Sequence, residues 1–396
     1  MFRIRRCLIV ILLFFSFTVL KAQIVTVNGY IKEMEGIYLF EKTLPTLSGE
    51  KIDAISYNLV HNRLNFKLYP TQNLTVALEL RNRIFSGKLL EQIPDYADII
   101  ATDDGLVDLS WNLAKGDKYF INTTIDRFYI DYNIGNWQIR AGRQRINWGI
   151  NLVWNPNDIF NAFSYIDFDY EERPGSDAVL LTWYPTMASS FDIAYKAADS
   201  IANRAYAAKY RFNLFNYDFQ VLAGTAGYDY VLGGGCTGSI WNLGFRGEAS
   251  WFKPIDKYED RSEEGVSASV SLDYSFPNSL YLHTSFLYNG LGTTDKGQSF
   301  SLIDPTMQLS AKKLSIGKYE LFGQASYPIG TLFNTGVAAM LNPVDLSMFV
   351  APSVSISLQD NLELYLTSQI MLGDSGTEYA AMGNLYAMFG RLRWSF

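Results

Sequence analysis

Basic side chains recur at even spacing in several segments of the chain, and even spacing places side chains on one face of an extended strand. A row of fixed positive charges performs no covalent chemistry, but in a narrow water-filled passage it attracts anions. We predict that such residues form one basic wall, on which Glu79 and Asp131 also lie. The residues of this wall are Arg63, Lys67, Arg81, Arg83, Arg127, Arg140, Arg391 and Arg393. The alternative is that they are ordinary solvated side chains on the wet face of a sheet.

A second group of residues, rich in aromatic rings and carboxylates, lies between residues 148 and 176. Asn155, Pro156 and Asp158 are typical of a helix start and predict a short helix over 156–165. So many rings are costly on a free external loop, and we therefore expect the segment to fold inward, with its carboxylates toward water. The residues assigned to this predicted constriction are Trp154, Asp158, Phe160, Asp167, Asp169, Glu171 and Glu172. The alternative is a loop that covers the mouth of the passage.

If both predictions hold, the basic wall and the acidic segment face each other across the narrowest point. Such an arrangement makes a transverse field, in which polar solutes align while apolar solutes are slowed. Screening extends over ~8 Å at physiological salt, comparable with the width of a constriction, so the field is expected to persist in the cell.

The residue types give little support for catalysis or for metal binding. The chain has two histidines, His61 and His283, and although Ser279 and Ser285 lie near His283, no orienting acid completes a nucleophilic site, so no enzyme is expected. The carboxylates have neither His nor Cys at useful spacing, so we expect no metal and no cofactor. Cys236, in a glycine-rich run, is interpreted as a small packed residue.

Paired segments of alternating apolar and polar residues run through the chain, joined by turn residues such as Pro70-Thr71-Gln72-Asn73. This pattern predicts an all-β protein, an antiparallel transmembrane β-barrel of sixteen to eighteen strands, with eighteen favoured. The predicted strands are 24–33, 56–69, 73–85, 118–133, 136–147, 176–184, 188–197, 203–213, 215–224, 228–239, 243–253, 264–276, 279–290, 313–326, 330–342, 345–358, 361–373 and 383–396. A barrel of this size leaves an aqueous lumen, because only barrels of ~8 strands are filled by side chains.

The connections between these strands differ in length on alternate sides. Short turns join one set of neighbours, whereas long polar connections near 86–118, 148–176, 254–264 and 291–313 join the other. This asymmetry is typical of membrane barrels, whose short turns are periplasmic. Because the strand count is even, both termini are expected in the periplasm. The inward-folded loop lies between the fifth and sixth predicted strands.

The two ends of the chain predict export and membrane assembly. Residues 1–22 combine Arg3, Arg5 and Arg6 with an apolar run and form a predicted cleaved signal peptide, which leaves 23–396 as a single barrel domain. Cleavage removes four of the 33 basic residues, leaving 29 against 40 acidic ones, a balance that argues against nucleic-acid binding. The last strand alternates apolar with basic residues and ends on Phe396.

Several of these features resemble known outer-membrane proteins of Gram-negative bacteria. The terminal Phe396 resembles the signal by which the barrel-assembly machinery recognises its substrates, and the inward loop is similar to the constriction loop of general porins. Locally, the sequence resembles an uncharacterised porin-like family, through Gly142-Arg143-Gln144, Trp148-Gly149, Asn155-Pro156-Asn157-Asp158 and Arg173-Pro174-Gly175. The resemblance implies an outer-membrane location, contact with outer-membrane lipid and a possible homotrimer.

We therefore expect a porin-like channel for passive or weakly selective passage of small hydrophilic solutes. One alternative is the outer-membrane component of a lipid or polysaccharide export system, which the aromatic loop would also suit. A barrel enzyme is the third hypothesis. A fold argument does not decide the solute.

Overall fold

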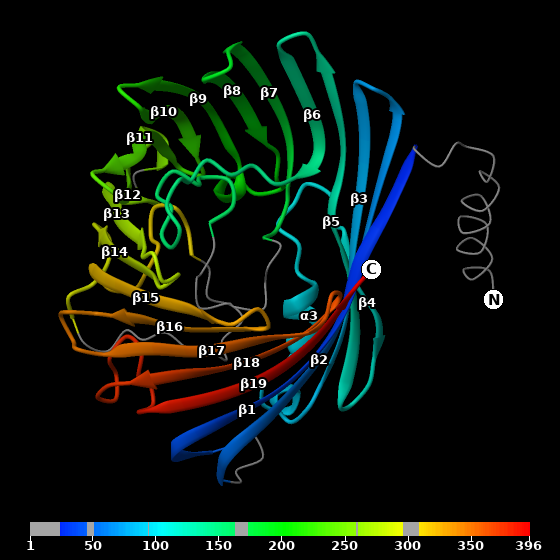
Figure 1. Ribbon diagram of the computed structural model, residues 1–396, viewed down its shortest axis with the longest axis vertical. Helices are drawn as coiled ribbons and strands as arrows, with labels where there is room; N and C mark the ends of the chain where they lie inside the picture. Colours follow the sequence, from blue (N-terminus) through cyan, green and yellow to red (C-terminus); the bar gives the residue numbers. More distant parts are fainter. Residues whose placement is uncertain (1–23, 46–50, 94, 163–172, 259, 296–308) are drawn as a thin grey trace.

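The computed structural model describes residues 24–45, 51–93, 95–162, 173–258, 260–295 and 309–396. The predicted signal peptide lies outside the described residues. Among the described residues, no helix is long and apolar enough to cross a membrane. All strands belong to one antiparallel sheet, and Figure 1 shows them as a ring around an interior into which the chain after β6 projects.

The sheet closes on itself, because β1 pairs with both β2 and β19. The strands in chain order are β1 (Val25–Pro45), β2 (Lys51–Thr71), β3 (Leu74–Ser86), β4 (Ser110–Lys115), β5 (Tyr119–Ile134), β6 (Trp137–Gln144), β7 (Ser176–Thr186), β8 (Ser189–Lys196), β9 (Ala205–Leu214), β10 (Tyr217–Ala226), β11 (Asp229–Ile240), β12 (Leu243–Pro254), β13 (Gly265–Ser275), β14 (Tyr281–Asn289), β15 (Tyr319–Ile329), β16 (Phe333–Leu341), β17 (Met348–Gln359), β18 (Leu362–Leu372) and β19 (Leu385–Ser395). Without β4 these are the eighteen predicted strands, so the prediction of eighteen is confirmed and the alternative of sixteen is wrong.

Closure of the barrel uses the last residue of the chain. The backbone N–H of Gly29 donates to the carbonyl of Phe396 at 3.0 Å, and the N–H of Phe396 donates to the carbonyl of Gly29, also at 3.0 Å. Along the same seam, Tyr30 pairs with Ser395 and Phe40 with Leu385. Both described ends of the chain therefore lie at one end of the barrel, together with the short turns.

The predicted alternation of inward and outward side chains is confirmed. Phe128 on β5 is 53% exposed and Trp394 on β19 is 46% exposed, whereas Arg127 and Arg391, one or three residues away, are buried inside the barrel. Because successive side chains of a strand point to opposite faces, the apolar set faces outward and the charged set faces the lumen.

Strand β4 is absent from the prediction. It pairs with the part of β5 from Phe120 to Thr124, beyond the point where β6 ends its own pairing with β5 at Phe128. Only six residues long, it carries too short an alternation to stand out within a polar connection. It therefore extends the wall of β5 on the long-loop side rather than adding a strand that crosses the membrane.

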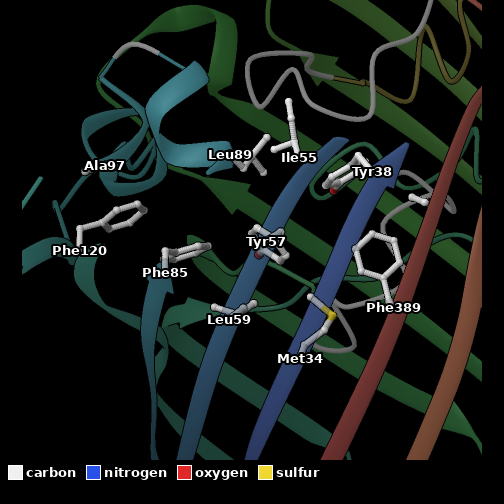
Figure 2. Packing of buried hydrophobic residues seen from close by; sticks show 11 residues of the cluster. Met34, Tyr38, Ile55, Tyr57, Leu59, Phe85, Leu89, Ala97, Phe120 and Phe389 are labelled. Atoms are coloured by element: carbon white, nitrogen blue, oxygen red, sulfur yellow. The ribbon is translucent and has the colours of Figure 1, made fainter. Parts of the chain in front are cut away.

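The β3–β5 connection also carries helices α2 (Leu89–Gln92) and α3 (Tyr96–Ala101), which lie inside the ring of strands. Figure 2 shows their Leu89 and Ala97 beside inward side chains of the wall, such as Tyr57 and Phe85. The cluster stands on β1, β2, β3, β5 and β19, and the rings of Phe85 and Phe120 stack at 4.5 Å. The sequence prediction described this connection only as a long polar loop, so its apolar contact with the wall is new. Two 3₁₀ helices, η1 (Ile201–Asn203) and η2 (Asp256–Tyr258), lie in later connections.

Candidate pore lining and constriction

The chain from Arg145 to Ala162, here called the inward segment, lies inside the ring of strands and packs on the inner face of the wall from β7 to β15. Its Trp148 is 2% exposed, with its ring 4.8 Å from that of Phe160 in a perpendicular arrangement. The Trp148 carbonyl accepts a hydrogen bond from the Gln220 side chain on β10 at 2.6 Å, and Lys209 on β9 lies over the Trp148 ring. Inward-facing alanines of β7, β8 and β9 make room for these rings. The predicted inward fold is confirmed for these residues.

Further along, the inward segment is anchored to β13 and β15. The Asn151 amide donates to the carbonyl of Ser269 at 3.1 Å, and the Ser271 hydroxyl donates to the Asn151 side-chain oxygen at 2.8 Å. Trp154 is 5% exposed and meets the ring of Phe322 edge-on at 6.3 Å, while its carbonyl accepts from Ser269. Trp154 and Phe160 therefore hold the segment to the wall, as the sequence analysis expected of its aromatic residues.

A run of glycines in β11 allows the closest approach of the segment. The Asn157 side chain donates to the carbonyl of Gly234 at 3.0 Å and accepts from the Ser250 hydroxyl at 2.7 Å. A Cβ atom at Gly233 would stand 2.7 Å from the Asn157 oxygen and 2.5 Å from that of Ser250, closer than real contacts allow. Glycine at this inward position thus leaves space for the Asn157 side chain.

The predicted helix over 156–165 is wrong for residues 156–162, the part that lies within the described residues. The chain there forms turns, in which the N–H of Asp158 bonds to the carbonyl of Asn155 at 3.1 Å and that of Ile159 to the carbonyl of Asn157 at 3.0 Å. Asn155 and Asn157 are buried, and the bonds of Asn157 to β11 and β12 hold the chain in turns. Tertiary contacts thus override a local capping signal.

The sequence analysis expected Asp158 to face water. The structure shows that it is fully buried within the inward segment. Burial raises the pKa of Asp158 to about 7, and the nearby positive charges of Arg145 and Arg173 offset only part of this effect. Burial and the neighbouring Arg145 lower the pKa of Arg173 to about 9. Asp158 is therefore buried rather than on the wall of an open passage, whereas Arg173 is only partly buried and lines the cavity described below. The other predicted acids, Asp167, Asp169, Glu171 and Glu172, lie outside the described residues.

On the opposite wall, the predicted basic residues are held by carboxylates. Arg63 binds Glu79 at 2.5 Å and Asp126 at 2.6 Å, and Arg81 binds the second oxygen of Asp126 at 2.9 Å. Asp126 lies where the β3–β5 register shifts between Glu79 and Leu80, so it is an extra residue of β5. This bulge aims its carboxylate between the two arginines. The wall is thus basic but partly neutralised by its own acids.

The remaining predicted wall residues lie on the same inner face in varied surroundings. Arg83 donates to Asn122 at 2.8 Å, and Arg140 binds Asp131 at 2.5 Å. Arg127 donates to the carbonyls of Asp126 and Arg173, which links the wall to the end of the inward segment's connection. The other three are Lys67, which is partly exposed, Arg391, which binds Glu363 at 3.4 Å, and Arg393, which lies over the Tyr30 ring.

A cavity of about 820 Å³ lies between this wall and the inward segment, on the long-loop side of the lumen. Arg81 and Arg83 line it on one side, and Ile159 and Phe160 on the other. Nine further charged residues that the sequence analysis did not assign to a site contribute to its lining: Asp103, Asp104, Asp126, Arg143, Arg173, Lys196, Arg204, Asp229 and Lys312. Of these, Arg143 bridges Asp103 and Asp177, and Lys312 binds Asp229 at 2.9 Å. Lys196 could have been inferred from its position, because it follows the inward-facing Asp192 and Ala194 at even spacing.

The residues considered for catalysis do not form a site within the described residues. The Ser285 hydroxyl bonds to that of Ser271 at 2.9 Å, and the His283 ring lies 5.2 Å from that of Phe322. No group of three or more His, Cys, Asp or Glu side chains in the described part of the chain could hold a metal ion.

The barrel is similar in structure to OccK proteins of Pseudomonas aeruginosa. OccK5 (OpdH) superposes with a TM-score of 0.59 at 9% identity, and OccK9 (OpdG) with 0.58 at 10% identity; each match covers 94% of this chain and 98% of the other. OccK8 (OprE) matches with a TM-score of 0.55 at 10% identity, over the same shares of the two chains. The fold is that of an outer-membrane porin. By sequence, no family model and no curated protein matches the chain.

The porin likeness therefore rests on the barrel itself and not on the short motifs quoted above. At 9 to 10% identity this similarity shows the fold alone. The roles of the residues that line the lumen therefore follow only from their own geometry.

Proposed function

We propose that the chain is an outer-membrane channel for passive or weakly selective passage of small hydrophilic solutes. The observation that carries this proposal is the cavity of about 820 Å³ between the basic wall and the inward segment. Charged side chains line it on several sides, and such groups replace part of the hydration of a polar solute while they repel an apolar one. An eighteen-stranded wall leaves room for both the inward segment and a water path.

The charges that line the cavity favour anions over cations. Seven lining residues are basic and four are acidic, although the whole chain is acidic with a net charge of −7. Low-dielectric walls focus the field of such an excess, which raises the local concentration of anions. The cavity lining and the chain as a whole thus carry net charges of opposite sign, as expected if the lining charges serve passage.

The same proposal predicts how the barrel is oriented in the outer membrane. Residues 1–22 would be removed on export, and residues 23–396 would form one domain with its short turns and both termini in the periplasm. A tag inserted beside Ser262 or Gly292, on long connections, is expected to be labelled from outside intact cells. A tag at Pro277-Asn278, on a short turn, should be labelled only after the outer membrane is opened. The reverse pattern would refute this orientation.

Conductance of the purified barrel in a planar bilayer tests the channel. The expected result is stepwise conductance with a reversal potential, in a salt gradient, that indicates anion preference. Shortening the connection between Asn155 and Glu172 should raise the conductance, because its described part, residues 155–162, packs on the inner face of the wall. A barrel that inserts but conducts nothing in either form would favour the exporter hypothesis instead.

A further inference from the structure

The last part of the β14–β15 connection, residues 309–318, borders the cavity and is here called the strap. Its first four residues line the cavity. Ala311 is 5% exposed and belongs to the same buried cluster as Phe160 of the inward segment. Farther along, Leu314 belongs to a cluster that includes Tyr379 of the β18–β19 connection. The strap therefore links the cavity with a connection that follows it by some 60 residues in the chain.

An ion pair holds the cavity end of the strap. The Lys312 ammonium lies 2.9 Å from a carboxylate oxygen of Asp229, the first residue of β11, and donates to the Ser262 hydroxyl at 2.7 Å. Ser262, in the β12–β13 connection, in turn donates to Asp229 at 2.8 Å. These contacts tie the strap to the long-loop rim of the barrel.

The other end of the strap is held by Glu378, in the β18–β19 connection. One carboxylate oxygen of Glu378 accepts from the Ser315 hydroxyl at 2.7 Å and from the N–H of Ile316 at 3.1 Å. The second oxygen accepts at 2.8 Å from the side chain of Asn342, which begins the β16–β17 connection. Glu378 therefore joins three connections of the long-loop side.

A second carboxyl group, that of Glu320 near the start of β15, meets Glu378 beside the strap. The two residues are 0% and 2% exposed, and their carboxyl groups hydrogen-bond to each other. A Cβ atom at Gly317 would stand 2.5 Å from an oxygen of each, so glycine allows the strap to pass this close. An ionised carboxylate has no donor, so a bond between two carboxyl groups requires a proton on one of them.

The strongest neighbours of this carboxyl pair are donors and acids rather than cations. The Tyr379 hydroxyl donates to Glu320 at 3.0 Å, and Asp345 accepts from the N–H of Glu378 at 2.7 Å. Burial, followed by the charges of Glu320 and Glu378, raises the pKa of Tyr379 well above its ordinary value, so Tyr379 stays a neutral donor. Asn289 of β14, which bonds to the strap backbone at 2.6 Å, is uncharged. Loss of the shared proton therefore leaves two buried like charges in contact.

We propose that the strap is a pH-sensitive lid of the cavity, closed while Glu320 and Glu378 share a proton and released when that proton is lost. The proposal rests on the channel function argued above. A glutamate in open water holds its proton only below about pH 4, so at neutral pH the closed state carries one proton more than the open state. The closed state therefore loses stability as pH rises, and the open fraction grows by up to about tenfold per pH unit.

Thiol labelling of the purified barrel in lipid vesicles tests the lid. Cys236 is first replaced by serine, and a cysteine is then placed either at Ala311, which is buried beside the cavity, or at Lys313, which is exposed on the same strap. A bulky maleimide labels each chain, and the ratio of the two rates cancels the effect of pH on thiol reactivity. The rate of Ala311→Cys relative to Lys313→Cys is expected to rise at least tenfold from about pH 5 to about pH 9.

Two changes at the carboxyl pair have opposite expected effects on this ratio. Glu320→Gln keeps an acceptor for Tyr379 and offers Glu378 an N–H at every pH, so the ratio should stay low and lose its pH dependence. Glu378→Ala removes the anchor of the strap, so the ratio should already be high at about pH 5. The matched control, Glu264→Gln, removes an exposed carboxylate of the β12–β13 connection and should keep the original profile. Heat-modifiable migration reports whether each variant has folded.

Two results would overturn the lid. A labelling ratio that does not change with pH would show that the strap stays closed, and a rise that survives Glu320→Gln would assign the titration to another group, such as Asp158. Conductance is recorded separately on the same preparation. A barrel that conducts nothing refutes the proposed channel, whereas the labelling ratio still reports whether the strap opens.

Discussion

At the scale of single residues, the electrostatic potential of the lumen depends on which carboxylate each arginine binds. Arg63 and Arg81 share Asp126, and Arg140 binds Asp131, so the positive wall is ordered and partly neutralised by acids on the same strands. Removing an arginine therefore does more than delete one charge, because it also leaves a carboxylate in the lumen without that partner.

Replacing Arg81, Arg83 and Arg140 together by serine is expected to shift the channel toward cations. Three positive charges leave the lumen, and Asp126 and Asp131 lose ion-pair partners, so the local potential becomes less positive. Reversal potentials in a salt gradient measure the change, which should weaken as salt rises because of screening.

The control for this prediction removes three exposed lysines that do not line the cavity, Lys115, Lys118 and Lys257. Their loss should leave ion preference unaltered. An equal shift in both triple variants would mean that net charge, rather than the wall, sets the preference.

The titration of Asp158 predicts that the stability of the packed inward segment depends on pH. Burial raises its pKa to about 7, above the ordinary 3.8, so the folded segment binds a proton more readily than the released one. The packed state is then most stable below about pH 4 and loses stability as pH rises toward 7, by at most ~1.4 kcal/mol per pH unit. Channel conductance should become larger or noisier between pH 5 and pH 8.

Asp158→Asn gives the matched comparison for this titration. The amide is nearly the same size but does not ionise, so conductance should lose this pH dependence. If the variant titrates as the original chain does, another group is responsible.

At the scale of elements, the inward segment and the strands beneath it form one packed unit. Small residues on the inner faces of β7 to β11, alanines and glycines, receive the large rings of Trp148 and Phe160 and the side chain of Asn157. On the other side of the lumen, α2 and α3 pack against inward side chains of β1, β2, β3, β5 and β19. The width of the passage between the inward segment and helices α2 and α3 depends on how closely each of them packs against the wall.

Gly233→Val is expected to displace the inward segment and raise conductance. Its Cβ would collide with Asn157 and Ser250, while valine itself suits a strand, so the barrel should still form. Gly323→Val on β15 is the control, because a Cβ there meets nothing within 4 Å. Unchanged conductance in both variants, measured in single channels, would show that the segment does not limit the passage.

At the scale of the whole molecule, the last residue completes one end of the seam that closes the barrel. Phe396 exchanges two backbone hydrogen bonds with Gly29, and its ring, 46% exposed, lies outward beside that of Trp394. The backbone bonds complete the seam between β19 and β1, whereas the ring is available to an assembly factor.

Phe396→Ser should lower the amount of barrel in the outer membrane without reducing secretion across the inner membrane. Deleting Phe396 should have the larger effect, because it also removes both seam hydrogen bonds. Heat-modifiable migration of the outer-membrane fraction reports assembly, and the periplasmic level reports secretion. Normal assembly of the serine variant would refute a recognition role for the ring.

The sequence by itself determined the barrel, because a two-residue period is a local property that each strand carries independently. Alternation such as that of Phe128, Ile130 and Tyr132 placed eighteen strands and their inner and outer faces, and connection lengths fixed which ends lie together. Only the tertiary structure decided what fills the lumen. The burial of Asp158, the turns in place of a helix and the contact of α2 and α3 with the wall depend on side chains far apart in the chain. The pairing of Arg63 and Arg81 with a bulged Asp126 likewise required three strands to be in register, which no local pattern encodes.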